Sequence, residues 1–280
     1  MKIRIFALAV SVGFILSVFG AALFIFRYYG AKPEEALPEK PAETVFLETE
    51  SANFLLIFEE EGNFGPFSRV NFDAKTGRIP VLSFSQKAAV DYGGVKISAG
   101  KLFSSVSPEV FAGTIETNLG IEISGYLIWN RESAEALIAK AGTFDYILPK
   151  DIRYSDGTRY VNLISGVQSM NGKKICDIIT NPKFSEGERC DTLSRMISAF
   201  FNRRLRRFLP ESGVYSVIFN YTKTDISAFD REKYSALIKV LCDSGESLSG
   251  HVTNDTEREV STGLLYFSEG TLGRIKKYFG

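Results

Sequence analysis

The chain has 280 residues and a mass of 31.1 kDa, and its 33 basic and 33 acidic residues cancel. This length suggests one large domain or two small ones with a sizeable core. The balanced charge argues against a nucleic-acid protein held by a large positive field. A hydrophobic fraction of 45% excludes wholesale disorder. One histidine and three cysteines argue against His-rich metal sites, zinc ribbons and a disulfide scaffold.

An uncharged apolar run covers residues 5–26 and follows Lys2 and Arg4. A helix of this length reaches about 33 Å, which is enough to cross the hydrocarbon core of a bilayer. The basic residues in front favour a cytoplasmic N-terminus. We therefore expect a cytoplasmic tail at 1–4, a transmembrane helix at 5–26 and an extracytoplasmic remainder in the cell membrane. A cleaved signal peptide is the alternative, although its apolar region is usually about 7–15 residues long.

Residues 27–46 predict a linker, because Pro33, Pro38 and Pro41 interrupt any helix and acidic residues keep the segment solvated. The extracytoplasmic domain is then expected at 47–280. Within it, Cys176 and Cys190 are close enough in sequence to close a loop through a disulfide. Unpaired, buried thiols are the alternative, and the sequence leaves both open.

The first part of the expected domain predicts strands. Residues 53–58 form a near-continuous apolar run of strand length, which is typical of a strand buried on both faces. A turn signal at 74–77 separates residues 70–73 from 78–84 and predicts a hairpin. A further strand is expected at 122–129.

The second part alternates helices with strands. After residue 129, Asn130 can cap a helix whose apolar residues recur at helical spacing, and Gly142 ends it. Residues 144–148 predict a strand, and apolar residues between 193 and 200 form a second helical stripe. Residues 214–221 predict another strand and 226–241 another helix. Interleaved elements of this kind favour an α/β domain with helices against a largely buried sheet.

Two charged clusters stand out, and neither forms a known catalytic motif. Glu59, Glu60 and Glu61 directly follow the first strand, where they could bind a cation or form a solvated loop. Arginines at 203, 204, 206 and 207 could meet anionic headgroups or wall phosphates, or they could complement a helix dipole. We favour the solvated loop and the dipole interpretation. The sequence contains no P-loop, no strand-coupled dinucleotide motif and no G-x-S-x-G.

Several short segments follow one another in a recognisable order. Residues 53–57 are Asn-Phe-Leu-Leu-Ile, and residues 73–77 are Asp-Ala-Lys-Thr-Gly. Lys-Ile-Ser-Ala follows at 96–99, and Glu-Thr-Asn-Leu-Gly-Ile follows at 116–121. Gly-Val-Gln-Ser-Met-Asn-Gly stands at 166–172. With the apolar N-terminus, this series resembles the LytR-CpsA-Psr family, membrane-anchored proteins of the Gram-positive type of envelope.

The resemblance implies a three-layer α/β/α fold with a mixed central sheet and an apolar tunnel that holds a prenyl chain. Members of the family transfer a phosphorylated glycopolymer from a polyprenyl pyrophosphate carrier to peptidoglycan, usually with magnesium. Arginines grip the pyrophosphate, because guanidinium groups bind phosphate oxygens bidentately. Clamping the developing charge is most of the catalysis in phosphoryl transfer. The implied partners are the membrane, polyprenyl-linked glycan and peptidoglycan.

This chain departs from the family at most of the arginine positions. Neutral residues stand where the family has arginines or their acidic partner: Asn63, Gly65, Thr180, Pro182 and Thr192. Gln86 replaces the arginine of the family's Ile-Pro-Arg-Asp segment. No residue is assigned as catalytic or as a metal ligand, and Mg²⁺ is expected only if catalysis survives. The remaining candidates for phosphate binding are Arg69, Gln86, Lys87, Lys96 and Arg195.

Two classes of function follow from these departures. The first is a surviving glycopolymer phosphotransferase. The second is a non-catalytic protein that binds lipid-linked glycan or scaffolds an active paralogue or another wall enzyme. Each charge-assisted hydrogen bond contributes roughly 1.5–3 kcal/mol, so the loss of several would slow transfer by several powers of ten. A nucleic-acid partner is not expected, because the extracytoplasmic part is slightly acidic and has no DNA-binding motif.

Overall fold

The computed structural model describes residues 50–280 except 61, 156, 158, 210–212 and 244–248. The expected tail at 1–4, the transmembrane helix at 5–26 and the linker at 27–46 lie outside the described residues. Within the described residues, no helix combines the length and the apolar run that crossing a membrane requires.

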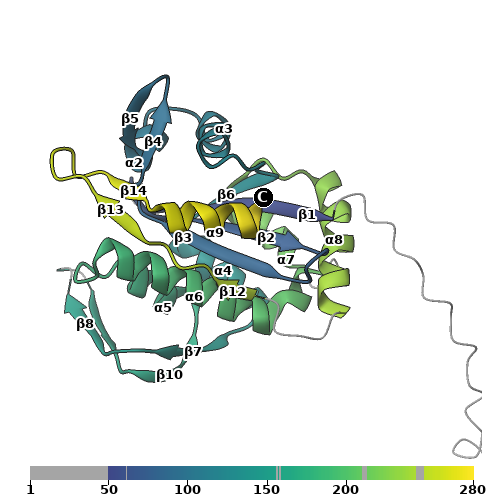
Figure 1. Cartoon of the computed structure of the whole chain (residues 1–280). Coiled ribbons are helices and arrows are strands. Elements are labelled where there is room, and N and C mark those ends of the chain that lie inside the picture. The colour runs from purple at the N-terminus through teal and green to yellow at the C-terminus, as the bar shows by residue number, and fades with distance from the viewer. Residues whose placement is uncertain (1–49, 61, 156, 158, 210–212, 244–248) are drawn as a thin grey trace, which may run out of the picture. The chain divides into compact units, whose positions relative to one another are not determined.

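A six-stranded mixed sheet forms the centre of the fold, in the order β11-β6-β1-β2-β3-β12 (Figure 1). Strands β1, β2 and β3 are antiparallel neighbours, whereas β6 runs parallel to β1 and β12 runs parallel to β3. Because β1, β3 and β6 point the same way, their carboxyl ends meet at one edge of the sheet. The strands are β1 (Ser51–Glu60), β2 (Asn63–Asp73), β3 (Ile79–Phe84), β6 (Gly125–Trp129), β11 (Lys223–Thr224) and β12 (Ser249–His251).

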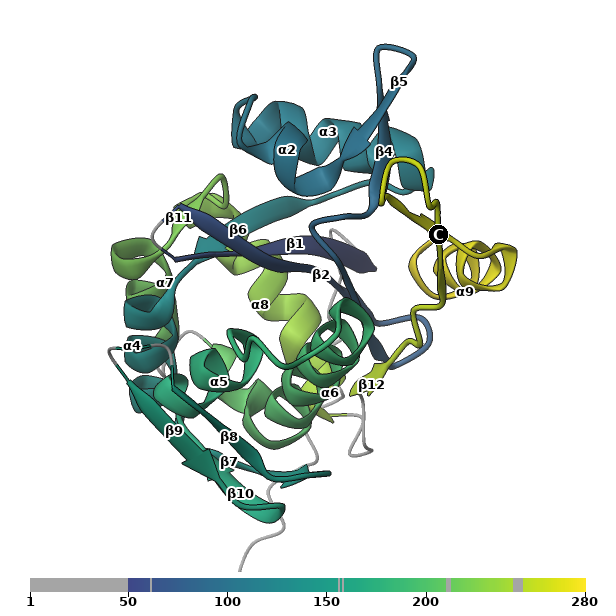
Figure 2. The same cartoon turned by 90° about the vertical axis from the view of Figure 1, so that its left-hand side faces the viewer.

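Helices cover both faces of this sheet (Figure 2). The face that we call the α9 face carries α2 (Ala99–Phe103), α3 (Pro108–Leu119) and α9 (Glu269–Phe279), with the small strands β4 (Ala89–Tyr92), β5 (Val95–Ser98), β13 (Thr256–Arg258) and β14 (Leu265–Phe267) beside them. The opposite face, the α6 face, carries α4 (Arg131–Ala141), α5 (Gly172–Ile179), α6 (Glu186–Arg204), the 3-10 helix η1 (Leu205–Phe208), α7 (Val214–Tyr221) and α8 (Ala228–Asp243).

The alternation of side chains along β1 divides the core into two parts. Phe54 and Phe58 join the cluster on the α6 face, whereas Leu55 and Ile57 join the cluster on the α9 face. All four side chains are buried. A strand buried on both faces reads as a continuous apolar run, which is the pattern that residues 53–58 show.

A ribbon of two antiparallel strand pairs lies outside the helices of the α6 face (Figure 2). Its strands are β7 (Phe144–Leu148), β8 (Ile152–Ser155), β9 (Tyr160–Leu163) and β10 (Gly166–Met170). β7 pairs with β10 and β8 pairs with β9, so the ladder is broken at residues 149–151 and 164–165. The Asp151 carboxylate joins the two breaks by accepting a hydrogen bond from the backbone N–H of Ser165 at 2.9 Å.

The structure confirms the α/β class, the mixed central sheet and most predicted elements. The strand at 53–58, the hairpin around 74–77, the strand at 144–148 and the helices at 193–200 and 226–241 are all present. The strand expected at 122–129 is shorter and begins at Gly125. Asn130 caps α4, because its side chain accepts a hydrogen bond from the Ser133 backbone N–H at 2.9 Å.

The strand predicted at 214–221 is wrong, because this segment is helix α7. Its β-branched and aromatic residues favour a strand locally. Its buried residues, Val214, Tyr215 and Ile218, nevertheless lie on one side of a helix, and α7 packs against α4 and η1. Tertiary packing therefore overrides the local preference.

The cysteines are buried free thiols, so the alternative of unpaired thiols is confirmed for Cys176 and Cys190. Burial raises the pKa of both thiols to about 12. They are therefore protonated at neutral pH and behave as small apolar side chains.

Candidate functional site

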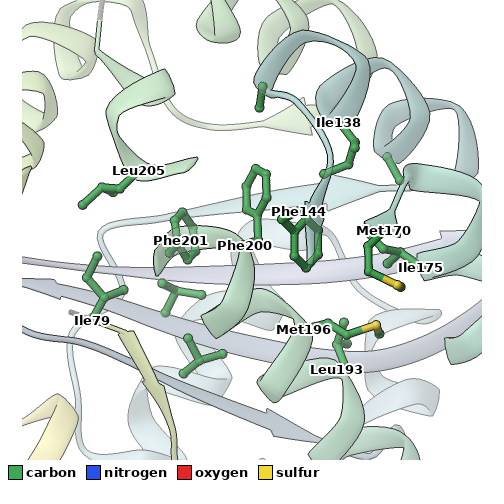
Figure 3. Close-up of a cluster of buried hydrophobic side chains, with 14 of the residues drawn as sticks. Ile79, Ile138, Phe144, Met170, Ile175, Leu193, Met196, Phe200, Phe201 and Leu205 are labelled. Carbon is green, nitrogen blue, oxygen red and sulfur yellow. The ribbon is translucent and has the colours of Figure 1, made fainter. Parts of the chain in front are cut away.

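An apolar cavity of about 140 Å³ lies between the sheet and the helices of the α6 face. Its only lining residues with hydroxyl groups are Ser133 and Thr222. Both hydroxyls are occupied, because they donate to the backbone carbonyls of Tyr221 and Ile218. An apolar void without polar partners favours hydrocarbon over water. Figure 3 shows side chains from α4, β7, α5 and α6 converging on this region, among them Ile138, Phe144, Ile175, Leu193, Met196 and Phe200.

A polar cleft of about 760 Å³ lies at the carboxyl ends of β1 and β6. Trp129 and Thr222 line both the cavity and the cleft, so the two spaces adjoin. Among the described residues, two basic ones, Arg131 and Lys223, and four acidic ones, Glu59, Glu60, Glu132 and Glu135, line the cleft. An apolar compartment therefore meets a charged one at the edge of the sheet.

Arg131 is the central charge of the cleft. Its Nε donates to Glu60 Oε1 at 2.8 Å, and its Nη1 donates to Asp177 Oδ1 at 2.8 Å. Its side chain is 20% exposed, and its Nη2 has no hydrogen-bond partner among the described residues. Burial alone would lower the pKa of Arg131, but the two carboxylates outweigh it and raise the pKa above its usual value. The guanidinium is therefore fixed in place and always charged.

The local sequence explains why Arg131 occupies this position. Strand β6 ends at Trp129, Asn130 caps the next helix, and Arg131 is the first residue of α4. The side chain thus leaves the carboxyl edge of the sheet beside Glu60, the last residue of β1. Trp129 packs against Phe58, with ring centroids 4.8 Å apart, and fixes the end of β6 relative to β1.

The candidate Arg69 lies on the opposite side of the sheet from the cavity. It is fully buried on the α9 face, where its guanidinium stacks 5.1 Å from the Phe279 ring centroid. Nη2 donates to the Glu122 carbonyl at 3.3 Å, while Nε and Nη1 have no partner among the described residues. Burial lowers the pKa of Arg69 to about 10.

The other candidates for phosphate binding are dispersed. Gln86 and Lys87 follow β3, and Lys87 Nζ lies 3.6 Å from Glu186 at the start of α6. Lys96 is on the β4–β5 hairpin and pairs with Asp91 at 3.2 Å. Arg195 pairs with Asp191 along α6 at 2.8 Å. None of Arg69, Gln86, Lys87, Lys96 and Arg195 lines the cavity or the cleft.

The positions at which the resemblance implies an arginine or its acidic partner also have distinct surroundings. A Cβ atom added at Gly65 would lie 2.5 Å from Phe58 Cδ1, so the packing of Phe58 leaves no room for an acidic side chain there. Thr180 caps the C-terminus of α5, and its hydroxyl donates to the Cys176 carbonyl. Asn63 begins β2, Pro182 is exposed between α5 and α6, and Thr192 is buried on α6.

Sequence reasoning missed Arg131, Asp177 and Lys223 as residues of this site. Arg131 carried one usable signal, because polar residues directly after parallel strands gather at one edge of a sheet. Asp177 carried none, since only the packing of α5 against α4 brings it to Arg131. Of the acidic run at 59–61, Glu60 is an ion-pair partner of Arg131 and is only partly exposed.

The arginines at the end of α6 bind backbone carbonyls. Arg204 donates to the Thr143 carbonyl through Nε at 2.8 Å, and Arg206 donates to the Cys242 carbonyl at 3.3 Å. Arg203 and Arg204 lie in the last turn of α6, where cations complement the helix dipole. These contacts favour the structural interpretation of this cluster.

The described residues do not fit a magnesium site. No group of three or more acidic, histidine or cysteine residues among them is arranged to hold a metal ion. Glu60, which lines the cleft, and Asp177 are both engaged by Arg131. A magnesium ion prefers several free oxygen ligands at octahedral positions, which this arrangement does not offer.

Solved structures share this fold at low sequence identity, whereas no family model and no curated protein matches the chain. A structure from Eubacterium siraeum named as a transcription regulator has a TM-score of 0.72 and 15% identity, and covers 88% of this chain and 95% of that chain. TagV of B. subtilis has a TM-score of 0.66 and 16% identity, and the match covers 83% of this chain and 97% of TagV. TagT bound to LIIa-WTA has a TM-score of 0.64 and 16% identity, and the match covers 82% of this chain and 90% of TagT. At these identities the likeness establishes a common fold.

Proposed function

We propose that this chain is an envelope protein of the LytR-CpsA-Psr type, anchored by residues 5–26 with its domain outside the membrane. It holds a polyprenyl-pyrophosphate-linked glycopolymer and serves its transfer to peptidoglycan. TagT and TagV, with which it shares its fold, are LytR-CpsA-Psr proteins, and one TagT structure is bound to LIIa-WTA. The observation that carries the proposal is the apolar cavity that adjoins a polar cleft at Trp129 and Thr222.

The two compartments match the two halves of such a ligand. A prenyl tail gains free energy when it leaves water for an apolar cavity, by roughly 25 cal/mol per Å² of buried surface. A pyrophosphate and its glycan need polar groups, which the cleft supplies. Arg131 is the cation best placed for the phosphates, because it lines the cleft with the shared residue Trp129, and its Nη2, although buried, has no acceptor among the described residues. In the transfer, an acceptor hydroxyl of peptidoglycan forms a new P–O bond to the glycan-linked phosphorus while the phosphoanhydride P–O bond breaks. Polyprenyl phosphate leaves, and the proton of the hydroxyl passes to water.

A second candidate function is non-catalytic binding of the same lipid-linked glycan, as a carrier or as a scaffold for an active paralogue. The balance of charge favours it, since four carboxylates and two cations line the cleft. The Arg131 charge is moreover shared between Glu60 and Asp177. The negative charge that develops on the departing polyprenyl phosphate is stabilised poorly by such a set.

Binding of the tail can be tested by filling the cavity. Leu137→Trp places a large ring among the cavity residues, whereas Ala139→Trp adds the same ring to an exposed position of α4. We expect full-length Leu137→Trp in detergent to lose at least tenfold in affinity for a polyprenyl pyrophosphate, and Ala139→Trp to bind like the wild type. Equal affinities of both variants would contradict a tail in this cavity.

Transfer can be tested with a labelled, lipid-linked saccharide and peptidoglycan. If the chain is a transferase, the wild type transfers label and Arg131→Gln is slower by about two powers of ten, the effect of losing a group that stabilises the developing charge. If it is a non-catalytic holder, the wild type transfers no label, while Arg131→Gln still weakens binding. Wild-type turnover that survives Arg131→Gln unchanged would remove Arg131 from the site.

A further inference from the structure

A second cleft, away from the candidate site, lies where the outer ribbon breaks. It has a volume of about 340 Å³ and is formed by the β7–β8 turn and the loop between α5 and α6. Its basic residues are Lys150, Arg153 and Lys183, and its only acidic lining residue is Asp151. No residue of this cleft lines the apolar cavity or the polar cleft.

The decisive feature is how the cations are held. Lys183 Nζ donates to the Arg153 backbone carbonyl at 2.7 Å, so its position is fixed by a neutral group and its charge is not cancelled. Behind the loop, Arg189 Nη2 donates to the carbonyls of Asn181 and Phe184 at 3.0 and 3.4 Å. Arg189 Nε is buried without a partner among the described residues. Two cations around the same loop are thus positioned by carbonyl oxygens.

The other cations have carboxylate partners. Lys150 Nζ lies 2.6 Å from Glu188 Oε1 and 5.1 Å from the Phe184 ring centroid. Arg153 pairs with Asp151 at 3.1 Å. Each of these pairs is neutral, so the charge that remains at the cleft is that of Lys183, with Arg189 behind the loop. An ammonium group carries three N–H donors, and Lys183 uses one of them on the carbonyl.

From this arrangement we propose that the second cleft binds a phosphodiester group of a soluble anionic polymer. The net positive charge selects an anion, and the free N–H donors of Lys183 suit phosphate oxygens. The cleft is concave and larger than a single phosphate, which suits a repeating unit that enters it rather than a headgroup in a flat bilayer. The assignment of this polymer to the wall glycopolymer rests on the proposed function, whereas the anion binding does not.

The test uses the full-length chain in nanodiscs of phosphatidylcholine and a glycerol-phosphate oligomer as the probe. We expect Lys183→Gln to weaken binding about tenfold, because it removes an uncancelled charge. Lys150→Gln should weaken it less, since Glu188 already cancels that charge. Lys101→Gln, an exposed lysine on α2 of the other face, is the matched control and should bind like the wild type. Lys183→Arg keeps the charge and should retain binding. If it does, a loss of binding in Lys183→Gln reflects the missing charge and not unfolding.

Three results would overturn the proposal. The first is equal affinity of Lys183→Gln and the wild type for the oligomer. The second is an equal loss of oligomer affinity in Lys183→Gln and Lys101→Gln. Binding of anionic-lipid vesicles that depends on Lys183, without binding of the oligomer, would assign the cleft to a membrane instead. Leu137→Trp should leave oligomer binding unchanged, so a failed lipid-linked ligand and a failed second cleft are distinguishable.

Discussion

The two faces of the central sheet are packed in opposite ways. The α6 face surrounds an apolar cavity of about 140 Å³, although large aromatic side chains such as Phe144, Phe200 and Phe201 line it. The α9 face buries a whole arginine, Arg69, against the Phe279 ring and leaves two of its nitrogen atoms without partners among the described residues. One face thus keeps an apolar void, and the other buries a charge.

The α9 face also has a pocket of about 150 Å³, but polar Lys96 and Asn118 line it together with apolar residues, whereas the cavity of the α6 face is apolar. On the α6 face itself, α4 and α5 approach so closely that a Cβ atom at Gly172 would lie 2.3 Å from the Glu135 backbone nitrogen. Packed interiors leave few voids larger than a water molecule. A void bounded by helices in such close contact is therefore held open by the fold.

The largest expected effect breaks that close contact. Gly172→Ala forces the backbones of α4 and α5 apart and should lower the free energy of unfolding by about 3 kcal/mol. Gly187→Ala is the matched control, because no atom lies within 4 Å of its added Cβ and alanine favours the helix by about 0.5–1 kcal/mol. Urea denaturation of the full-length chain in a mild detergent measures both, and equal stabilities would contradict a tight α4–α5 contact.

On the α9 face, two substitutions of Arg69 separate its volume from its charge. Arg69→Ala should lower the free energy of unfolding by about 2–3 kcal/mol, because it leaves a cavity under α9. Arg69→Met keeps most of the volume and removes a desolvated charge with unpaired donors, so we expect it to be neutral or stabilising by about 1 kcal/mol. The same denaturation experiment decides, and a loss in Arg69→Met as large as that in Arg69→Ala would mean that the guanidinium itself stabilises the layer.

A matched pair of larger side chains compares the two faces directly. Ile275→Phe on α9 enters a filled core and should cost about 1–3 kcal/mol of unfolding free energy. Ile138→Phe on α4 projects toward the cavity and should change it by less than about 1 kcal/mol. Melting temperatures of the two variants rank the costs. Equal destabilisation would show that the cavity cannot accept added volume.

The smallest expected effect is a pH dependence on the α6 face. The pKa of Cys176 is raised by burial from 9.0 to about 12, so the folded state favours the neutral thiol. The stability that this shift contributes is present below pH 9 and is lost as the pH rises toward 12. Relative to Cys176→Ala, the free energy of unfolding of the wild type should therefore fall by about 1 kcal/mol between pH 8 and pH 10. Parallel pH profiles of the two proteins would mean that the thiol is accessible to water.

Helical spacing and strand alternation determined most elements of this fold in advance. The run at 53–58 and the cap at Asn130 are local signals, because they depend on a few neighbouring residues and on backbone hydrogen bonds. The segment 214–221 failed because its composition favours a strand while its packing against α4 and η1 selects a helix. Of the site, the sequence indicated the acidic run after the first strand but not the contacts that it makes.

By itself, the sequence determined the α/β class, the mixed order of elements and an apolar interior, since these follow from the periodicity of side chains. Only the tertiary structure decided which charges meet. It brought Glu60, Arg131 and Asp177 together from three separate elements and placed Arg69 on the far side of the sheet. The reason is physical: periodicity fixes which face of an element is buried, whereas the neighbours of a polar side chain depend on how distant elements pack.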